Sequence, residues 1–78
     1  MYTKKGDSMQ EYEELSPREY DVLKELVKGE TNYTIAKKLF ISLGTAKSHV
    51  SSILRKLHVS TRTAAAAKGV YLLMNLKH

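Results

Sequence analysis

Apolar residues recur along most of the chain at the three- and four-residue spacing that is typical of helices. The clearest start signal is Ser16-Pro17-Arg18-Glu19, in which a capping serine, a proline in the first turn and a glutamate form a capping box. Leu15 is placed to pack against this end of the helix. We expect the helix to end at Gly29, with an apolar face made of Val22, Leu23, Leu26 and Val27.

Two further helices are predicted on either side of a short turn. Thr31 is the expected cap of a helix that runs to about Phe40, with an apolar stripe of Ile35, Ala36 and Leu39. Ser42 is the expected cap of the next helix, which runs to about Leu57 and has an apolar face of Ala46, Val50, Ile53, Leu54 and Leu57. Two helices joined in this way are typical of a helix-turn-helix.

The opposite face of the helix over residues 42–57 carries small, hydrogen-bonding and basic side chains and no carboxylate. At 100° per residue this face holds Gly44, Ser48, Ser51, Ser52 and Arg55, with Lys47 and His49 on its two flanks. An ordinary solvated helix usually mixes Glu with Lys at i,i+4 spacing. A face without Glu can approach base edges and phosphates without repulsion, so it favours DNA contact over a merely solvated surface.

A fourth helix is predicted over residues 62–75, and it has two apolar sides. One side holds Ala65, Ala66, Gly69, Leu72, Leu73 and Leu76. The other side holds Ala64, Ala67, Val70, Tyr71 and Met74. A peripheral helix of a small domain needs only one apolar face, so the second indicates a partner. We expect this second face to form a homodimer, although alanines are also simply good helix formers.

Charge is divided sharply along the chain. All eight acidic residues lie within the first 30 positions, whereas the stretch from Thr31 to His78 has none and carries eight Lys and Arg residues. The net charge of the whole chain is +5. A field of one sign in the second part attracts a polyanion, which favours nucleic acid as the partner.

Several classes of protein are disfavoured by composition. The absence of cysteine excludes disulfides and thiolate metal sites. His49, His58 and His78 are scattered and no catalytic constellation or phosphate loop is visible, so we expect no enzyme activity, cofactor or metal. No apolar run reaches the roughly 20 residues of a membrane span, and no signal peptide is visible. We therefore expect a soluble, cytoplasmic protein that has no membrane partner.

From Leu15 to about Ala67 the sequence resembles the LuxR/GerE-type DNA-binding domain, which also forms the effector part of NarL/FixJ-type response regulators. The resemblance is carried by LSPRE, Gly29, Ile35–Ala36, Ile41–Ser42, TAKSH, RKL and the spacing of Val59, Arg62 and Thr63. It implies an all-α domain of four helices without a wing, in which the second and third helices form the helix-turn-helix. It also implies that the fourth helix pairs two protomers.

The resemblance also assigns roles to residues by position. Lys47, Ser48 and Ser51 would read bases. Phosphate contacts would come from Asn32, Tyr33 and Thr45, and the basic and polar surface adds Lys37, Lys38, His49, Ser52 and Arg55 to them. The resemblance further implies that Glu19 and Arg62 form a structural pair that ties the fourth helix to the first.

Some residues depart from the family pattern. Ala46 and Ala66 replace usual valines, Gly69 replaces a usual alanine, and Thr34 replaces a usual glutamate. Ser51 stands where the family often has a longer side chain, so base preference cannot be transferred to this chain.

The sequence as a whole predicts a tail or linker over residues 1–14 and one DNA-binding domain over residues 15–78. The expected function is sequence-specific binding of double-stranded DNA in a bacterial transcription regulator, either free-standing or as the effector domain of a longer protein. An RNA polymerase contact remains open as a further partner. Two alternatives also remain open: a helix-turn-helix that docks a protein, and a promoter reader similar to region 4 of a sigma factor.

Overall fold

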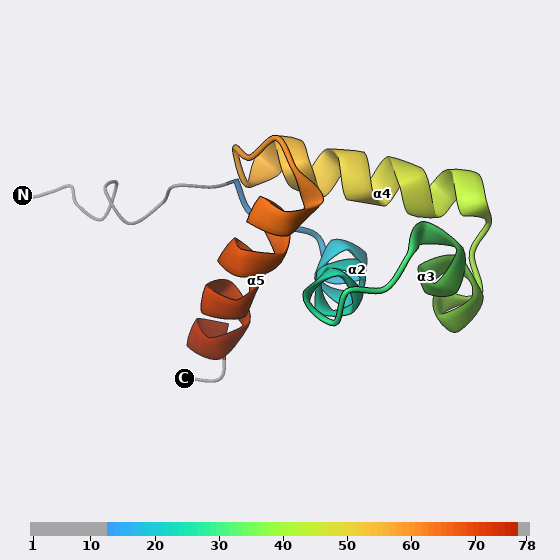
Figure 1. Cartoon of the computed structure of the whole chain (residues 1–78), viewed down its shortest axis with the longest axis horizontal. Coiled ribbons are helices and arrows are strands. Elements are labelled where there is room, and N and C mark those ends of the chain that lie inside the picture. The colour runs from blue at the N-terminus through green and yellow to red at the C-terminus, as the bar shows by residue number, and fades with distance from the viewer. Residues whose placement is uncertain (1–12, 77–78) are drawn as a thin grey trace, which may run out of the picture.

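The computed structural model describes residues 13–76, which form four helices and no strand (Figure 1). In chain order they are α2 (Pro17–Val27), α3 (Asn32–Leu39), α4 (Leu43–Lys56) and α5 (Arg62–Leu76). The predicted all-α class with four helices is therefore confirmed. Apart from Glu13 and Glu14, the expected tail over residues 1–14 lies outside the described residues.

The start of α2 follows the capping box that the sequence predicts. The Ser16 side chain accepts a hydrogen bond from the Glu19 N–H at 3.1 Å, and the Glu19 carboxylate accepts one from the Ser16 N–H at 2.8 Å. Pro17 occupies the first turn, where a missing N–H costs nothing. The helix ends at Val27, and Gly29 adopts a φ of +84° that a residue with a side chain rarely takes.

The helix-turn-helix is set by two hydroxyl caps and one left-handed residue. Thr31 caps α3 and Ser42 caps α4, each by accepting a hydrogen bond from the N–H three residues later. Between them, Phe40 has a φ of 58° and ends α3 one residue earlier than the predicted boundary. This turn is short, because only residues 40–42 separate the end of α3 from the start of α4.

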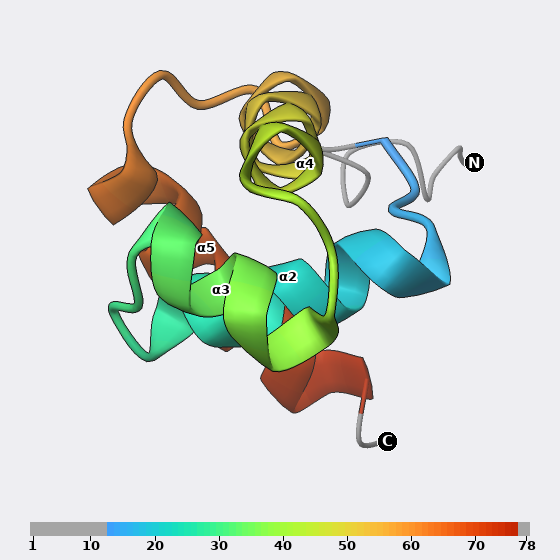
Figure 2. The ribbon, with the colours of Figure 1, turned by 90° about the vertical axis from the view of Figure 1, so that its right-hand side faces the viewer.

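Helix α4 lies across the other three helices (Figure 1), and the view along it in Figure 2 shows it above α2 and α3. The core between these helices is apolar. Its fully buried members include Val22, Leu23, Ile35, Ala46, Ile53, Leu57 and Ala65. One side of α4 is therefore buried, while the side away from the core faces outward.

Gly69 allows α5 to pack closely against α2. A Cβ at this position would lie 2.7 Å from Leu23 Cδ1 and 2.9 Å from Val27 Cγ2. Leu23 is fully buried, so a side chain at position 69 would force the packing between α5 and α2 to shift. The glycine at this position, where the family usually has alanine, is thus explained by the short distance between the two helices.

Glu19 joins the start of α2 to the C-terminal half of α4. Glu19 is 6% exposed, and its carboxylate accepts hydrogen bonds from Lys56 Nζ at 2.9 Å and from Ser52 Oγ at 2.7 Å, in addition to the Ser16 N–H. Burial alone would raise the pKa of Glu19, but the hydrogen bonds from Lys56, Ser16 and Ser52 outweigh it and lower the pKa to about 2.

The expected pair between Glu19 and Arg62 is not formed, and this expectation is corrected. Arg62 instead donates to Asn32 Oδ1 at 2.6 Å and to the Glu30 carbonyl at 2.7 Å. Glu19 bonds to α4, and Arg62 bonds to the start of α3 and the residue before it. Both side chains join elements of the fold, but each does so with a different partner.

A second buried carboxylate joins α2 to α3. Glu25 accepts hydrogen bonds from Lys38 at 3.2 Å and from Lys28 at 3.4 Å, and Lys38 also donates to Glu30 at 3.1 Å. Burial would raise the pKa of Glu25, but the bonds from Lys38 and Lys28 lower it overall. Both helices of the helix-turn-helix are therefore attached to α2 by lysine–carboxylate contacts.

We expect Glu19→Gln to destabilise the fold by about 2–3 kcal/mol at pH 7, because it removes a buried charge that three donors face. The depressed pKa means that the stabilisation is present above about pH 4.5 and is lost as the pH falls toward about 2. Urea unfolding at pH 7 and at pH 3 measures this. Exposed Glu14→Gln is the control, and equal unfolding midpoints for the two variants at pH 7 would contradict the assignment.

Candidate nucleic-acid interface

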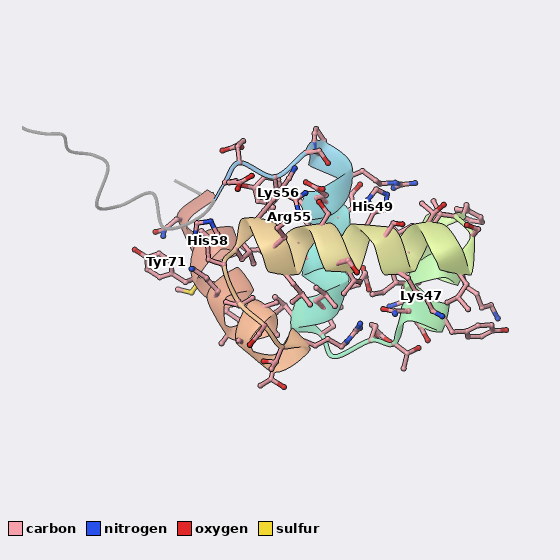
Figure 3. All side chains as sticks on the ribbon, turned by 90° about the horizontal axis from the view of Figure 1, so that it is seen from above. Lys47, His49, Arg55, Lys56, His58 and Tyr71 are labelled. Carbon is pink, nitrogen blue, oxygen red and sulfur yellow. The ribbon has the colours of Figure 1, made fainter. Side chains whose placement is uncertain are left out.

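The outward face of α4 consists of small and polar side chains. Gly44, Ser48, Ser51 and Arg55 are exposed, and this face is turned to the viewer in Figure 3, which looks down on α4 from above. No acidic residue belongs to α4. The prediction that this face points away from the core is confirmed for these four residues but not for Ser52, which is half-buried and bonds to Glu19. The chemistry of the exposed part suits close approach to a polyanion.

Lys47 and His49 lie on opposite sides of α4, as the sequence predicts (Figure 3). Lys47 is exposed and His49 is half-buried. Within the described residues, no carboxylate lies within ion-pair distance of Lys47. Its ammonium group is therefore available to an external acceptor.

The N-terminal end of α4 is suited to an anion. Its first turn has no acidic residue, so nothing offsets the positive end of the helix dipole. Ser42 Oγ donates to Thr45 Oγ1 at 2.9 Å, which leaves the Thr45 hydroxyl proton available as a donor. A Cβ at Gly44 would meet only Ser42 Oγ, at 3.9 Å, so the space beside this residue is open. A phosphate group of DNA can therefore approach the helix backbone closely here.

Helix α3 contributes an exposed aromatic and basic pair beside this end. Tyr33 is 64% exposed, and the Lys37 ammonium lies 5.5 Å from the centre of its ring. This cation–π contact orients Lys37 without neutralising it. Both residues are among the expected phosphate contacts, and both side chains are accessible.

Other expected phosphate contacts have partners within the fold. Lys38 donates to Glu30 and Glu25, and these bonds raise its pKa. Asn32 Oδ1 accepts from Arg62, and Ser52 Oγ donates to Glu19. The separation of charge along the sequence is thus partly cancelled in space, because carboxylates from the first 30 positions pair with lysines from the second part.

Sequence reasoning missed two cations that satisfy helix ends. Arg18 donates to the Leu39 carbonyl at 2.9 Å, and Lys68 donates to the Leu57 carbonyl at 2.8 Å. Basic side chains near the C-terminal carbonyls of a helix are stabilising. These donors are distant in sequence from the helices they serve, so no local pattern could identify them.

The second apolar face of α5 is exposed, as the sequence predicts. Val70 is 45% exposed, Tyr71 64% and Met74 63%, whereas Leu72 on the other side is 5% exposed. Ala67 is also exposed and Ala64 is half-buried. The expected second face therefore exists, and no residue of the described chain covers it.

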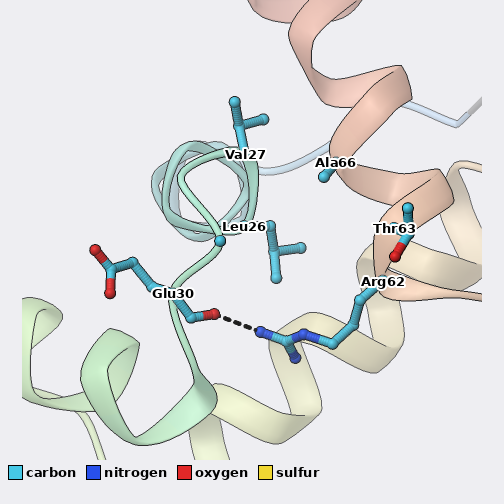
Figure 4. Close-up of a pocket in the computed structure, with 7 residues that line it drawn as sticks. Leu26, Val27, Glu30, Arg62, Thr63 and Ala66 are labelled. Atoms are coloured by element: carbon cyan, nitrogen blue, oxygen red, sulfur yellow. Dashed lines mark hydrogen bonds between the residues drawn. The ribbon is translucent and has the colours of Figure 1, made fainter.

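A shallow hollow of about 330 Å³ lies between the end of α2 and the start of α5 (Figure 4). Leu26, Val27 and Ala66 form part of its wall. Ala66 stands where the family usually has a valine. Arg62 lies at its polar edge and is hydrogen-bonded to the Glu30 carbonyl. The smaller side chain at position 66 accounts for part of this space.

Two absences hold over residues 13–76. No group of three or more His, Cys, Asp or Glu side chains there could hold a metal ion. No helix in the same range has the length and hydropathy needed to cross a bilayer.

Comparisons with known proteins agree with this geometry. The sequence profile described as "Bacterial regulatory proteins, luxR family" matches residues 13–68. The uncharacterized transcriptional regulatory protein YhcZ of Bacillus subtilis is 47% identical over 66 residues, which is 85% of this chain and 31% of that protein. The transcriptional regulatory proteins LiaR and LnrK of the same organism are 43% and 51% identical, over 78% and 73% of this chain and 29% and 26% of their own lengths. The chain thus spans less than a third of each of these relatives.

We expect Ser52→Ala and Ser51→Ala to differ in stability. Ser52→Ala removes a hydrogen bond to the buried Glu19 carboxylate and should destabilise the fold by about 1–2 kcal/mol. Ser51 is exposed, so its substitution should change the free energy of unfolding by no more than about 0.5 kcal/mol. Urea unfolding of both variants tests this, and a Ser51 variant as unstable as the Ser52 variant would refute it.

Proposed function

Since the chain belongs to the luxR family of bacterial regulatory proteins, and has the DNA-binding helix-turn-helix of transcriptional regulators, we propose that it reads specific sequences of double-stranded DNA with α4 in the major groove. The observation that carries the proposal is the outward face of α4, which is exposed, polar and free of carboxylates. A helix of this width fits the major groove of B-DNA.

Lys47, Ser48 and Ser51 are the proposed base readers. All three are exposed and lie in the N-terminal two-thirds of α4, the part of a recognition helix that enters the groove. The Lys47 ammonium can donate to O6 or N7 of guanine, and the serine hydroxyls can bond to either kind of base edge. The short serine side chains allow the helix backbone to approach the base pairs closely.

The proposed phosphate contacts differ in how available they are. Thr45, Tyr33 and Lys37 are exposed around the start of α4 and along α3, while His49 lies on the flank of α4 and Arg55 near its end. Asn32, Lys38 and Ser52 have partners in the fold, so their contact with phosphate requires an exchange of those partners. The accessible group near the start of α4 is the stronger part of the proposal.

We also propose that two copies pair through the exposed face of α5. Val70, Tyr71 and Met74 supply apolar surface, and Ala67 is small enough to allow a second helix to come near. A pair of α4 helices would then read two half-sites about one turn, or roughly 10 bp, apart. Since one protomer offers only three base readers, pairing raises specificity as well as affinity.

The chain could serve in either of two contexts. It matches less than a third of YhcZ and LiaR, so it corresponds to one part of these longer regulators. We propose an effector function in both contexts, whether the chain acts alone or within a longer protein. Contact with RNA polymerase remains an additional proposal, and residues 13–68 match the luxR family, which favours this assignment over the sigma-type alternative.

A protein-docking role is the second candidate, because the apolar face of α5 would suit a protein as well as a second copy. The two candidates differ in what they require of α4. DNA reading requires Lys47 and the serines, whereas docking through α5 does not. The substitutions below separate these functions.

We expect Lys47→Ala to reduce sequence discrimination, by roughly 1–3 kcal/mol between the preferred duplex and a scrambled one. Lys37→Ala should instead weaken binding to both duplexes about equally, since Lys37 would contact phosphate. The preferred duplex is obtained by selection from random DNA, and affinities are measured at two salt concentrations. An equal loss on both duplexes for Lys47→Ala would refute its base-reading role, and no binding to any duplex would favour the docking role.

We expect Met74→Glu to abolish pairing, because it places a charge in the proposed α5 interface. Asn75→Glu is the matched control, since it adds the same charge at an exposed polar neighbour. Sedimentation, with and without a duplex of two half-sites, measures the change. If the unmodified chain stays monomeric in both conditions, or if the two variants behave alike, the α5 interface is wrong.

A further inference from the structure

The chain that leads into α2 is attached to the end of α4. The Glu13 N–H donates to the Lys56 carbonyl at 2.8 Å, and Leu15, two residues later, is 3% exposed. These two attachments fix the backbone of residues 13–15 beside the last turn of α4. Because the backbone of Glu13 is bonded to α4, its side chain must also lie near α4.

This attachment places a carboxylate beside the outward face of α4. Arg55 Nη1 lies 3.8 Å from Glu13 Oε1, and Arg55 Nη2 donates to Ser52 Oγ at 3.4 Å. Arg55 lies on the same face as Ser48 and Ser51, about two turns after Ser48 and one turn after Ser51. Of the two α4 cations proposed to contact DNA, Arg55 thus has an acidic competitor, whereas Lys47 has none among the described residues.

We propose that Glu13 limits the affinity of the chain for DNA by competing with phosphate for the Arg55 guanidinium. This inference rests on the proposed DNA-binding function. The Glu13 carboxylate already forms an ion pair with the guanidinium, and a phosphate would be attracted to the same positive group, so the two anions compete for it. DNA that reaches Arg55 must displace Glu13.

The exposure of this pair makes displacement feasible. The side chains of Arg55 and Glu13 are 65% and 57% exposed, so water and salt screen their attraction. The Lys56–Glu19 pair on the adjacent side of α4 is 21% and 8% exposed and has further hydrogen bonds. The buried pair therefore holds α4 in place, and the exposed pair can exchange its carboxylate for a phosphate.

The test compares Glu13→Gln with Glu14→Gln, which removes the same charge from an exposed neighbour that has no ion pair with a described residue. Affinity for a random-sequence duplex is measured by fluorescence anisotropy at low and high salt. We expect Glu13→Gln to bind about two- to fivefold more tightly than Glu14→Gln at low salt. The difference should shrink at high salt, because screening weakens the pair and the phosphate contact alike.

A second comparison repeats both substitutions in an Arg55→Gln background, where the two variants should bind equally. Equal affinities of Glu13→Gln and Glu14→Gln in the original background would overturn the inference, as would a difference that persists without Arg55. Weaker binding by Glu13→Gln would also overturn it, since Glu13 would then orient Arg55 productively. If the unmodified chain binds no duplex, the proposed function itself fails, which is a distinguishable result.

Discussion

The position of α4 depends on the buried carboxylate of Glu19. This group begins as a local element, because it closes the capping box of α2 with Ser16. It then accepts hydrogen bonds from Ser52 and Lys56, which are 33 and 37 residues away. One side chain therefore joins the start of α2 to α4 and, together with the buried Ala46, Val50 and Ile53, fixes the rotation of α4 about its axis. Without this rotation, Lys47, Ser48 and Ser51 would not share an outward face at a defined angle to the rest of the domain.

Pairing of cations within the fold also determines which of them remain available at the proposed interface. Lys56 and Lys38 serve buried or half-buried carboxylates, and Arg62 serves a carbonyl and an amide oxygen. These cations stabilise the fold and are not freely available to DNA. Lys37 and Lys47, around the start of α4, are exposed and pair with no carboxylate of the described residues. The N-terminal half of α4 is therefore exposed, basic and free of carboxylates, which suits the part of a recognition helix that enters the groove.

The sequence predicted what depends on short-range order. Helix starts at Ser16, Thr31 and Ser42 were predictable because a cap bonds to an N–H three residues away. The buried and exposed faces of α4 and α5 followed from helical periodicity. The partners of Arg62 and Ser52 were not predictable, because they depend on how helices distant in sequence are placed in space. Ser52 belongs to the polar face by angle, yet it lies near enough to α2 to bond to Glu19, and only the packing of α4 on α2 reveals this.

Gly69 connects this packing to the proposed pairing of two copies. A Cβ at position 69 would overlap Leu23 and Val27, so the glycine sets how closely α5 approaches α2. The next residue along, Val70, already belongs to the exposed face of α5. Because α2 also bonds to α4 through Glu19, and Lys68 of α5 bonds to the Leu57 carbonyl at the end of α4, the direction of the α5 face relative to α4 is fixed within the protomer. The spacing of the two α4 helices in a pair would therefore be set inside each protomer, by the closeness of α5 to α2, as well as at the interface between protomers.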